Sequence, residues 1–198
     1  MQALLKTKLP CTVSAVISNR ADATGLAIAQ THGIATQVVA HGDYDDRESF
    51  DEALARAIDT YQPDFVVLAG FMRILTAKFV VRYHGRLVNI HPSLLPAYSG
   101  MHTHQRALRD GVKIHGCTVH FVTPDLDHGP VIIQAAVPVL SGDTEQTLSK
   151  RVLHEEHRIY PQALRWLCND QVILSDQGTV TLLHRKQIGH ALISPGLE

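Results

Sequence analysis

Two polar side chains, Asn89 and His91, stand two positions apart in a short, mainly apolar run that begins at Leu87. In an extended strand, residues two apart project from the same face, so both side chains would point into the same space. The amide of asparagine donates to a carbonyl oxygen, and histidine donates a hydrogen bond or a proton near neutral pH. The pair therefore suits the binding of a negatively charged oxygen.

A carboxylate is the natural third member of such a set, and Asp127 is the candidate. It lies in a loop that ends in Gly129-Pro130, a dipeptide that shapes the backbone. Formyl or acyl transfer to an amine forms an oxyanion that needs donors and an ammonium that must lose a proton to the leaving nitrogen. A carboxylate beside His91 favours the protonated imidazole and could take that proton directly or through a water. From spacing alone, an Asn-x-His pair is more often an ordinary hydrogen-bonded pair, so both interpretations stay open here.

The elements that must position these residues alternate along the first half of the chain. Short β-patterned runs are followed by amphipathic segments, and the clearest helix covers 47–61, where Asp46 can cap the start and Pro63 marks the end. This alternation predicts an α/β fold with an open, mostly parallel, Rossmann-like sheet flanked by helices. The four expected strands are 12–18, 36–40, 65–69 and 87–90.

The second half has a different pattern. Two long β-patterned runs, 114–122 and 131–139, are separated only by a short loop, which predicts an antiparallel portion. A long helix is expected over 144–160, capped by Asp143 with Gln146 three residues on.

A small hairpin is expected at the end of the fold, from 172–175 and 179–183, after a kink or continuation of the long helix at Pro161. We therefore expect a single domain over 1–184 and a loose tail over 185–198.

The start of the chain is unusual for this class, because it opens on a helical stretch, 1–9, with no strand before it. In open α/β domains the turn after the first strand commonly cradles a phosphate with glycine amides and a helix N-terminus. None of the 13 glycines forms a Gly-x-Gly pair, so no dinucleotide fingerprint or P-loop is predicted elsewhere. The sequence thus predicts a fold whose first strand is missing.

Composition narrows the ligand and the compartment. Lys and Arg total 18 against 19 Asp and Glu, which favours a small-molecule ligand and no nucleic acid or membrane partner. The three cysteines form no close pair, which indicates a reducing compartment, and the cytoplasm is expected. We expect Cys117 to be a buried strand residue rather than a nucleophile. The 13 histidines include His102 and His104, yet no zinc pattern surrounds them, and no metal is expected.

Longer motifs make the prediction specific. Residues 89–96 (NIHPSLLP) and 100–108 (GMHTHQRAL) resemble the formyltransferases that use 10-formyltetrahydrofolate, as do 70–75 and 126–130. The resemblance extends from Gln2 to about Asp170. It implies transfer of a formyl group to the amino group of phosphoribosylglycinamide, because relatives that act on aminoacyl-tRNA differ after the Leu-Leu-Pro.

The resemblance also implies roles for individual residues. It makes Asn89, His91 and Asp127 the catalytic trio, and it places His102 near the site. Glu156 matches a residue that holds the ribose of the substrate, although Leu153, three positions earlier, is polar in many relatives. Oligomeric state is expected to be monomer or homodimer. The implied folate contacts are Arg47, Met72, Arg73, Ile74, Leu75, Asn89, Thr123 and Asp127.

One departure from the family concerns the N-terminus. Relatives begin with a strand and a loop of the form Ile-Ser-Gly-x-Gly-Ser-Asn, whereas this sequence begins at Met1 and Gln2. The sequence therefore leaves two functions open: an active transferase whose start lies upstream, or a non-catalytic folate-binding remnant that cannot hold the phosphate.

Overall fold

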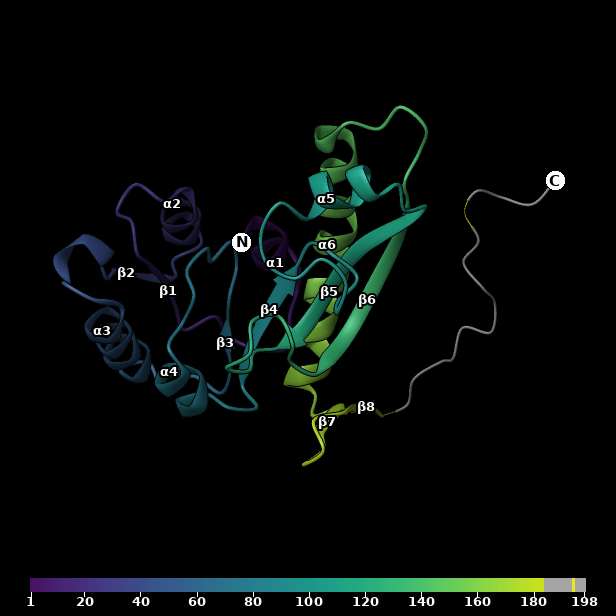
Figure 1. Cartoon of the computed structure of the whole chain (residues 1–198). Helices are drawn as coiled ribbons and strands as arrows, with labels where there is room; N and C mark the ends of the chain where they lie inside the picture. The colour runs from purple at the N-terminus through teal and green to yellow at the C-terminus, as the bar shows by residue number, and fades with distance from the viewer. Residues whose placement is uncertain (184–193, 195–198) are drawn as a thin grey trace.

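The computed structural model describes residues 1–183 and 194. Within them the strands form three sheets flanked by helices (Figure 1). Parallel pairing in the first half and antiparallel pairing in the second confirm the predicted α/β class. The prediction for 185–198 falls almost entirely outside the described residues.

The first unit is small. The short helix α1 (Gln2–Lys6) leads to strand β1 (Ala15–Ser18), which pairs in parallel with β2 (Ala35–Val38). Helix α2 (Thr24–Thr31) packs on both strands, and Leu26 and Ala29 bury their side chains there. Helix α1 is the first element of the described chain.

The second unit contains the four-stranded sheet with the order β3-β4-β5-β6. Strand β3 (Val66–Val67) is parallel to β4 (Leu87–His91), and β4 is antiparallel to β5 (Ile114–Phe121), which is antiparallel to β6 (Val131–Pro138). Because side chains alternate across a strand, one face of β4 and β5 presents apolar residues and the other presents polar ones. The apolar face includes Val88, Cys117, Val119 and Phe121.

The long helix α6 (Glu145–Cys168) packs against that apolar face and crosses behind β4–β6 in Figure 1. It continues through Pro161. The predicted cap was wrong by one residue, since Thr144 caps the helix and Thr147 returns the bond. The carboxylate of Asp143 accepts from the Leu140 amide and the guanidinium of Arg151 instead, and this hydrogen bonding lowers its pKa.

A second core lies between β3 and two helices, α3 (Arg47–Asp59) and α4 (Ala77–Arg82), which follow the 3-10 turn η1 (His41–Asp43). The predicted cap of α3 is confirmed, because Asp46 accepts from the Ser49 amide at 2.7 Å.

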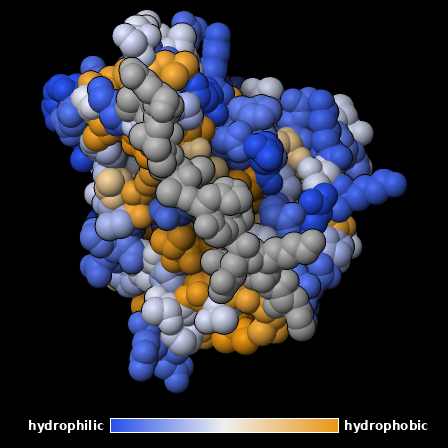
Figure 2. Space-filling model, turned by 90° about the vertical axis from the view of Figure 1, so that its right-hand side faces the viewer, coloured by the Kyte–Doolittle hydropathy of each residue, from blue (hydrophilic) through white to orange (hydrophobic). Residues whose placement is uncertain are grey.

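The remaining elements are α5 (Thr103–Asp110) and the hairpin of β7 (Val172–Leu174) and β8 (Val180–Leu182), which confirms the expected terminal hairpin. Figure 2 shows the side of the molecule on which β6 forms the edge of its sheet, where apolar surface lies between hydrophilic borders. Val131 and Leu140 are among the exposed large apolar side chains. No helix in the described residues has the length and apolar character needed to cross a membrane.

Candidate active site

Strands β4 and β5 bring four polar side chains together on the face opposite α6. Asn89 pairs with His120 and His91 pairs with Thr118 in the antiparallel register. Residues directly opposite each other in such a pair project from the same face. His91, Thr118 and His120 are all buried, and the chain that follows β4 is hydrogen-bonded to His91 and Thr118.

His91 is held by the loop that follows it. Its Nε2 atom lies 2.9 Å from the carbonyl oxygen of Tyr98. A carbonyl only accepts hydrogen bonds, so Nε2 carries a hydrogen in this arrangement. The loop thus fixes the orientation of the imidazole and leaves Nδ1 to face the second loop of the site.

That second loop joins β5 to β6 and carries Asp127. Its carboxylate Oδ2 accepts from the Gly100 amide at 2.8 Å and lies 3.4 Å from His91 Nδ1. Both side chains are about nine-tenths buried. The structure therefore brings His91 and Asp127 together, and a protonated imidazole between Tyr98 and Asp127 would have an acceptor at each nitrogen.

The backbone of the β5–β6 loop is tightly constrained. Asp127 has φ = 56°, a left-handed conformation that aspartate adopts more readily than most residues. At Gly129 an added Cβ would lie 1.7 Å from the carbonyl oxygen of Phe121. Only glycine allows the loop to pass this close to β5, and this approach delivers Asp127 to the site.

His120 is a site residue that the sequence did not single out. Its Nδ1 lies 2.8 Å from the Phe121 carbonyl and therefore carries the hydrogen, which leaves Nε2 to accept from the Asn89 amide at 3.5 Å. Burial lowers the pKa of His120, which keeps the ring neutral and Nε2 free to accept. A histidine inside a predicted buried strand was the available signal, but only the pairing register shows that it faces Asn89.

A pair of histidines, His104 and His115, packs against the loop that follows β4. His115 is buried, and its Nε2 lies 3.2 Å from Nδ1 of His104. Burial lowers the pKa of His115 to about 4, and its Nδ1 has no hydrogen-bond partner among the described residues. The ring packs edge-on against Tyr98, with 5.8 Å between centroids. His104 is thus engaged with His115 rather than with His102.

Apart from Asn89 and Asp127, the residues expected to contact folate lie on α3, on the segment after β3 and, for Thr123, in the β5–β6 loop. Met72 and Ile74 are exposed, at 78% and 57%. The guanidinium of Arg73 lies over the ring of Phe50, 4.8 Å from its centroid, and its Nε has no partner in the described chain. The other three differ in exposure: Arg47 is exposed, whereas Leu75 and Thr123 are partly buried.

In the described chain no side-chain hydrogen bond or ion pair joins the trio to the two residues expected to contact the second substrate. His102 is exposed and begins α5 with φ = 57°. Glu156 is partly buried on α6, where burial raises the pKa of its carboxyl group, and Leu153 is 45% exposed. The Cys117 thiol, whose pKa burial raises to about 12, is fully buried as expected.

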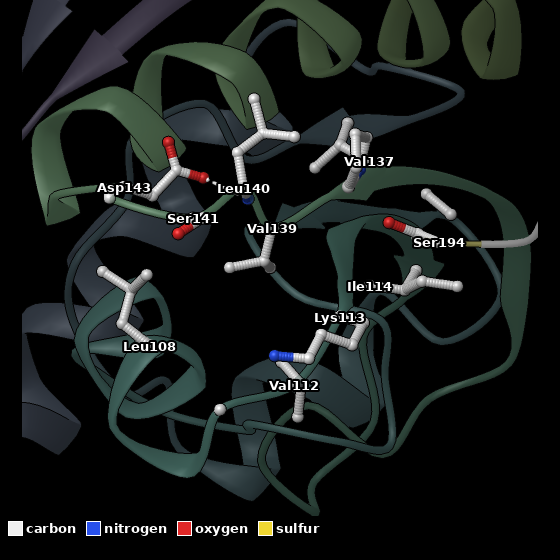
Figure 3. Close-up of a pocket in the computed structure, with 14 residues that line it drawn as sticks. Leu108, Val112, Lys113, Ile114, Val137, Val139, Leu140, Ser141, Asp143 and Ser194 are labelled. Atoms are coloured by element: carbon white, nitrogen blue, oxygen red, sulfur yellow. Dashed lines mark hydrogen bonds between the residues drawn. The ribbon is translucent and has the colours of Figure 1, made fainter. Parts of the chain in front are cut away.

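A hollow of about 800 Å³ lies elsewhere, at the other end of the β5–β6 hairpin (Figure 3). Its lining includes Leu108, Lys113, Val137 and Leu140, and none of the predicted site residues takes part. In the described residues, no three His, Cys, Asp or Glu side chains gather closely enough to hold a metal ion.

An α/β domain with an amide and an imidazole on a central strand and a carboxylate on a neighbouring loop has the features of a group-transfer enzyme. The model of the formyl transferase family matches residues 1–164. The chain belongs to this family, as the sequence motifs predicted.

Individual relatives agree with this assignment. The chain is 53% identical over 165 residues to phosphoribosylglycinamide formyltransferase of Escherichia coli, which covers 83% of this chain and 78% of the relative. It is 46% identical over 168 residues to the human trifunctional purine biosynthetic protein adenosine-3, covering 85% of this chain but 17% of that protein. Glycinamide ribonucleotide transformylase 1 from Symbiobacterium toebii superposes with a TM-score of 0.88 at 45% identity, covering 92% and 87% of the two chains.

Proposed function

We propose that this protein transfers the formyl group of 10-formyltetrahydrofolate to the amino group of phosphoribosylglycinamide, a step of purine biosynthesis. The activity of its relatives supports the substrates. The observation that carries the chemistry is the 3.4 Å approach of Asp127 to His91, on the face of the sheet that Asn89 shares.

Asn89 and His91 supply hydrogen bonds to the formyl oxygen. When the substrate amine attacks the formyl carbon, a C–N bond forms and the carbonyl electrons move onto oxygen. The second N–H of the Asn89 amide, which His120 does not use, and the Nδ1–H of His91 stabilise that oxyanion. The 3.4 Å contact to Asp127 is longer than a normal charged hydrogen bond, so the Nδ1–H is not tied up by the carboxylate and stays able to donate to the incoming oxygen.

Asp127 handles the proton. The attacking nitrogen becomes positively charged, and Asp127 takes its proton directly or through a water. The same proton then passes to the folate nitrogen as the old C–N bond breaks, so the step is balanced without an oxidant or a metal ion. The Gly100 amide, which donates to Oδ2, keeps the carboxylate oriented for both transfers.

The substrate surfaces follow the family. Arg47, the segment Met72–Leu75 and Thr123 would contact the folate, since Met72 and Ile74 offer apolar side chains and Arg73 offers an Nε that has no partner among the described residues. His102 and Glu156 would contact phosphoribosylglycinamide. Both substrates are small molecules, and we expect the reaction to occur in the cytoplasm.

The decisive experiment is a formyl-transfer assay with both substrates on the wild-type protein and on His91→Ala. We expect the wild type to turn over and His91→Ala to lose the oxyanion donor, a cost on the order of 100- to 1,000-fold in kcat. Folate binding, measured by calorimetry, should be largely retained. The matched control is His84→Ala, because His84 is an exposed histidine just before β4.

The outcomes of this assay distinguish an active formyltransferase from a non-catalytic folate-binding protein. A wild-type protein that binds 10-formyltetrahydrofolate without turnover would favour the non-catalytic folate-binding protein. Loss of folate binding in His91→Ala would make His91 a structural residue, and equal losses in His84→Ala would show that the assay reports general damage.

A further inference from the structure

The hydroxyl of Thr118 is fully buried on β5, directly opposite His91 in the strand register. It donates to the carbonyl of Ser93 at 2.7 Å and accepts from the amide of Leu95 at 3.0 Å. It also accepts from Nε2 of Gln134, on β6, at 3.0 Å. One donor and two lone pairs are all that a hydroxyl offers, so its hydrogen-bonding capacity is filled.

These bonds hold the bend that follows β4. Ser93 and Leu95 lie two and four residues after His91, and Gln134 Nε2 also donates to the Leu95 carbonyl at 2.9 Å. Within the bend, the Ser93 hydroxyl donates to the carbonyl of Ala97 at 2.6 Å. The bend is therefore tied to two strands, through the buried hydroxyl of Thr118 on β5 and through the side-chain amide of Gln134, an exposed residue on β6.

The same segment supplies both backbone groups that orient the trio. Just beyond the bend, the Tyr98 carbonyl accepts from His91, and the Gly100 amide donates to Asp127. Any shift of the bend would move these two groups together. Thr118 itself touches neither the imidazole nor the carboxylate by a hydrogen bond in the described chain.

Two further contacts hold the 92–100 segment in place independently of the Thr118 hydroxyl. An added Cβ on Gly116 would lie 2.8 Å from a methyl group of Leu94, so Leu94 already rests against the bare backbone of β5. Arg106 also donates to the Ser99 carbonyl at 2.5 Å. Removal of the Thr118 hydroxyl should therefore make the 92–100 segment more mobile while it stays packed against β5.

We propose that Thr118 is a positioning residue for formyl transfer: its hydroxyl fixes the 92–100 segment, and that segment sets the orientation of His91 and Asp127. This inference rests on the proposed function. The residue acts through the backbone and contacts no reacting atom.

The test compares Thr118→Val, which has the same shape but no hydroxyl, with Thr118→Ser, which keeps it. Thr118→Val should lower kcat on the order of 10- to 100-fold, since small displacements of catalytic groups are costly, while KM for both substrates changes by less than about threefold. Thr118→Ser should recover most of kcat. Gln134→Leu, which removes one of the three partners, should lie between them.

A second measurement needs no turnover. In ¹H–¹⁵N spectra of the full chain, Thr118→Val should shift the His91 ring signals and speed hydrogen exchange at the Gly100 amide, and Thr118→Ser should leave both near wild type. If the spectra change as expected but the wild type transfers no formyl group, the positioning stands and the proposed function fails. Unchanged kcat and unchanged His91 and Gly100 signals in Thr118→Val would overturn the positioning role, as would equal losses in Thr118→Ser.

Discussion

At the scale of single residues, the site depends on which atoms carry hydrogens. The Phe121 carbonyl fixes the hydrogen of His120 on Nδ1, and this leaves Nε2 as an acceptor for the Asn89 amide. The amide group of Asn89 is therefore turned with its nitrogen toward β5. Its second N–H is the one available to a formyl oxygen, so a buried neutral histidine determines how the amide is presented.

This dependence gives a prediction for His120. Replacement by Phe keeps a ring of similar size but removes the acceptor, so Asn89 can rotate, and kcat should fall about tenfold or more because an oxyanion donor is misplaced. Steady-state kinetics should show little change in KM. His154→Phe is the control, since His154 is exposed on α6. A variant with wild-type kcat would mean that Asn89 is oriented without His120.

The cluster of Asn89, His91 and Asp127 could be predicted from the sequence because these polar residues lie in an apolar strand and an adjacent loop, within motifs that resemble those of the family. His120 and Thr118 could not be, because their importance depends on register. Alternation places both on one face of a strand, but only the pairing of Asn89 with His120 and of His91 with Thr118 shows what they face. Pairing between distant segments is a tertiary property that local periodicity does not contain.

At the scale of elements, strands and helices were located better than their ends. The predicted strand 65–69 is shorter in the structure, where β3 covers only Val66–Val67. Backbone hydrogen bonding to β4 nevertheless continues beyond β3, since the Leu68 amide donates to the Val88 carbonyl. The sequence predicted Asp143 as the N-cap of α6, and aspartate is a common N-cap residue, but the Asp143 carboxylate forms an ion pair with Arg151 instead. That ion pair is formed by residues eight apart, and capping rules do not include it.

The β5–β6 loop gives the prediction for this scale. Gly129→Ala would place a methyl group 1.7 Å from the Phe121 carbonyl, so the backbone must move and take Asp127 with it. We expect a loss of roughly 1–3 kcal/mol in unfolding free energy, typical of overpacking, and a fall in kcat beyond tenfold.

Urea denaturation and the formyl-transfer assay measure these two effects. The control is Gly42→Ala, because a Cβ there meets nothing within 4 Å. If Gly129→Ala retained both stability and kcat, the close approach of the loop to β5 would not be what positions Asp127.

At the scale of the whole molecule, the central sheet is buried on both faces by different means. Helix α6 covers one face with apolar side chains such as Val152 and Leu148. The 92–100 segment is hydrogen-bonded to the other, which carries His91, Thr118 and His120. His115 and His120 are buried and burial lowers the pKa of each, so acid should weaken the fold through them.

His115 gives the clearest case. Its pKa falls from the ordinary 6.5 to about 4, chiefly through burial and then through the nearby His104 and His91. Between these two values the unfolded chain binds a proton that the folded chain does not, so unfolding free energy should decrease as pH falls from 6.5 to 4. The decrease from this group alone is about 3 kcal/mol. Burial also lowers the pKa of His104 and His120, which adds to the effect with the same sign.

His115→Phe should remove this share of the acid sensitivity, since the ring keeps its packing against Tyr98 but no longer titrates. Urea denaturation at pH 7.5 and pH 4.5 should give a smaller stability difference than in wild type, by up to about 3 kcal/mol. Asp143, whose pKa is lowered, loses its contribution only below its ordinary value of 3.8 and so lies outside this window. His84→Phe, at an exposed position, should keep the wild-type difference. If the stability difference between pH 7.5 and pH 4.5 were the same in His115→Phe as in wild type, His115 would be protonated in the folded protein at pH 4.5, and its ring would not be neutral.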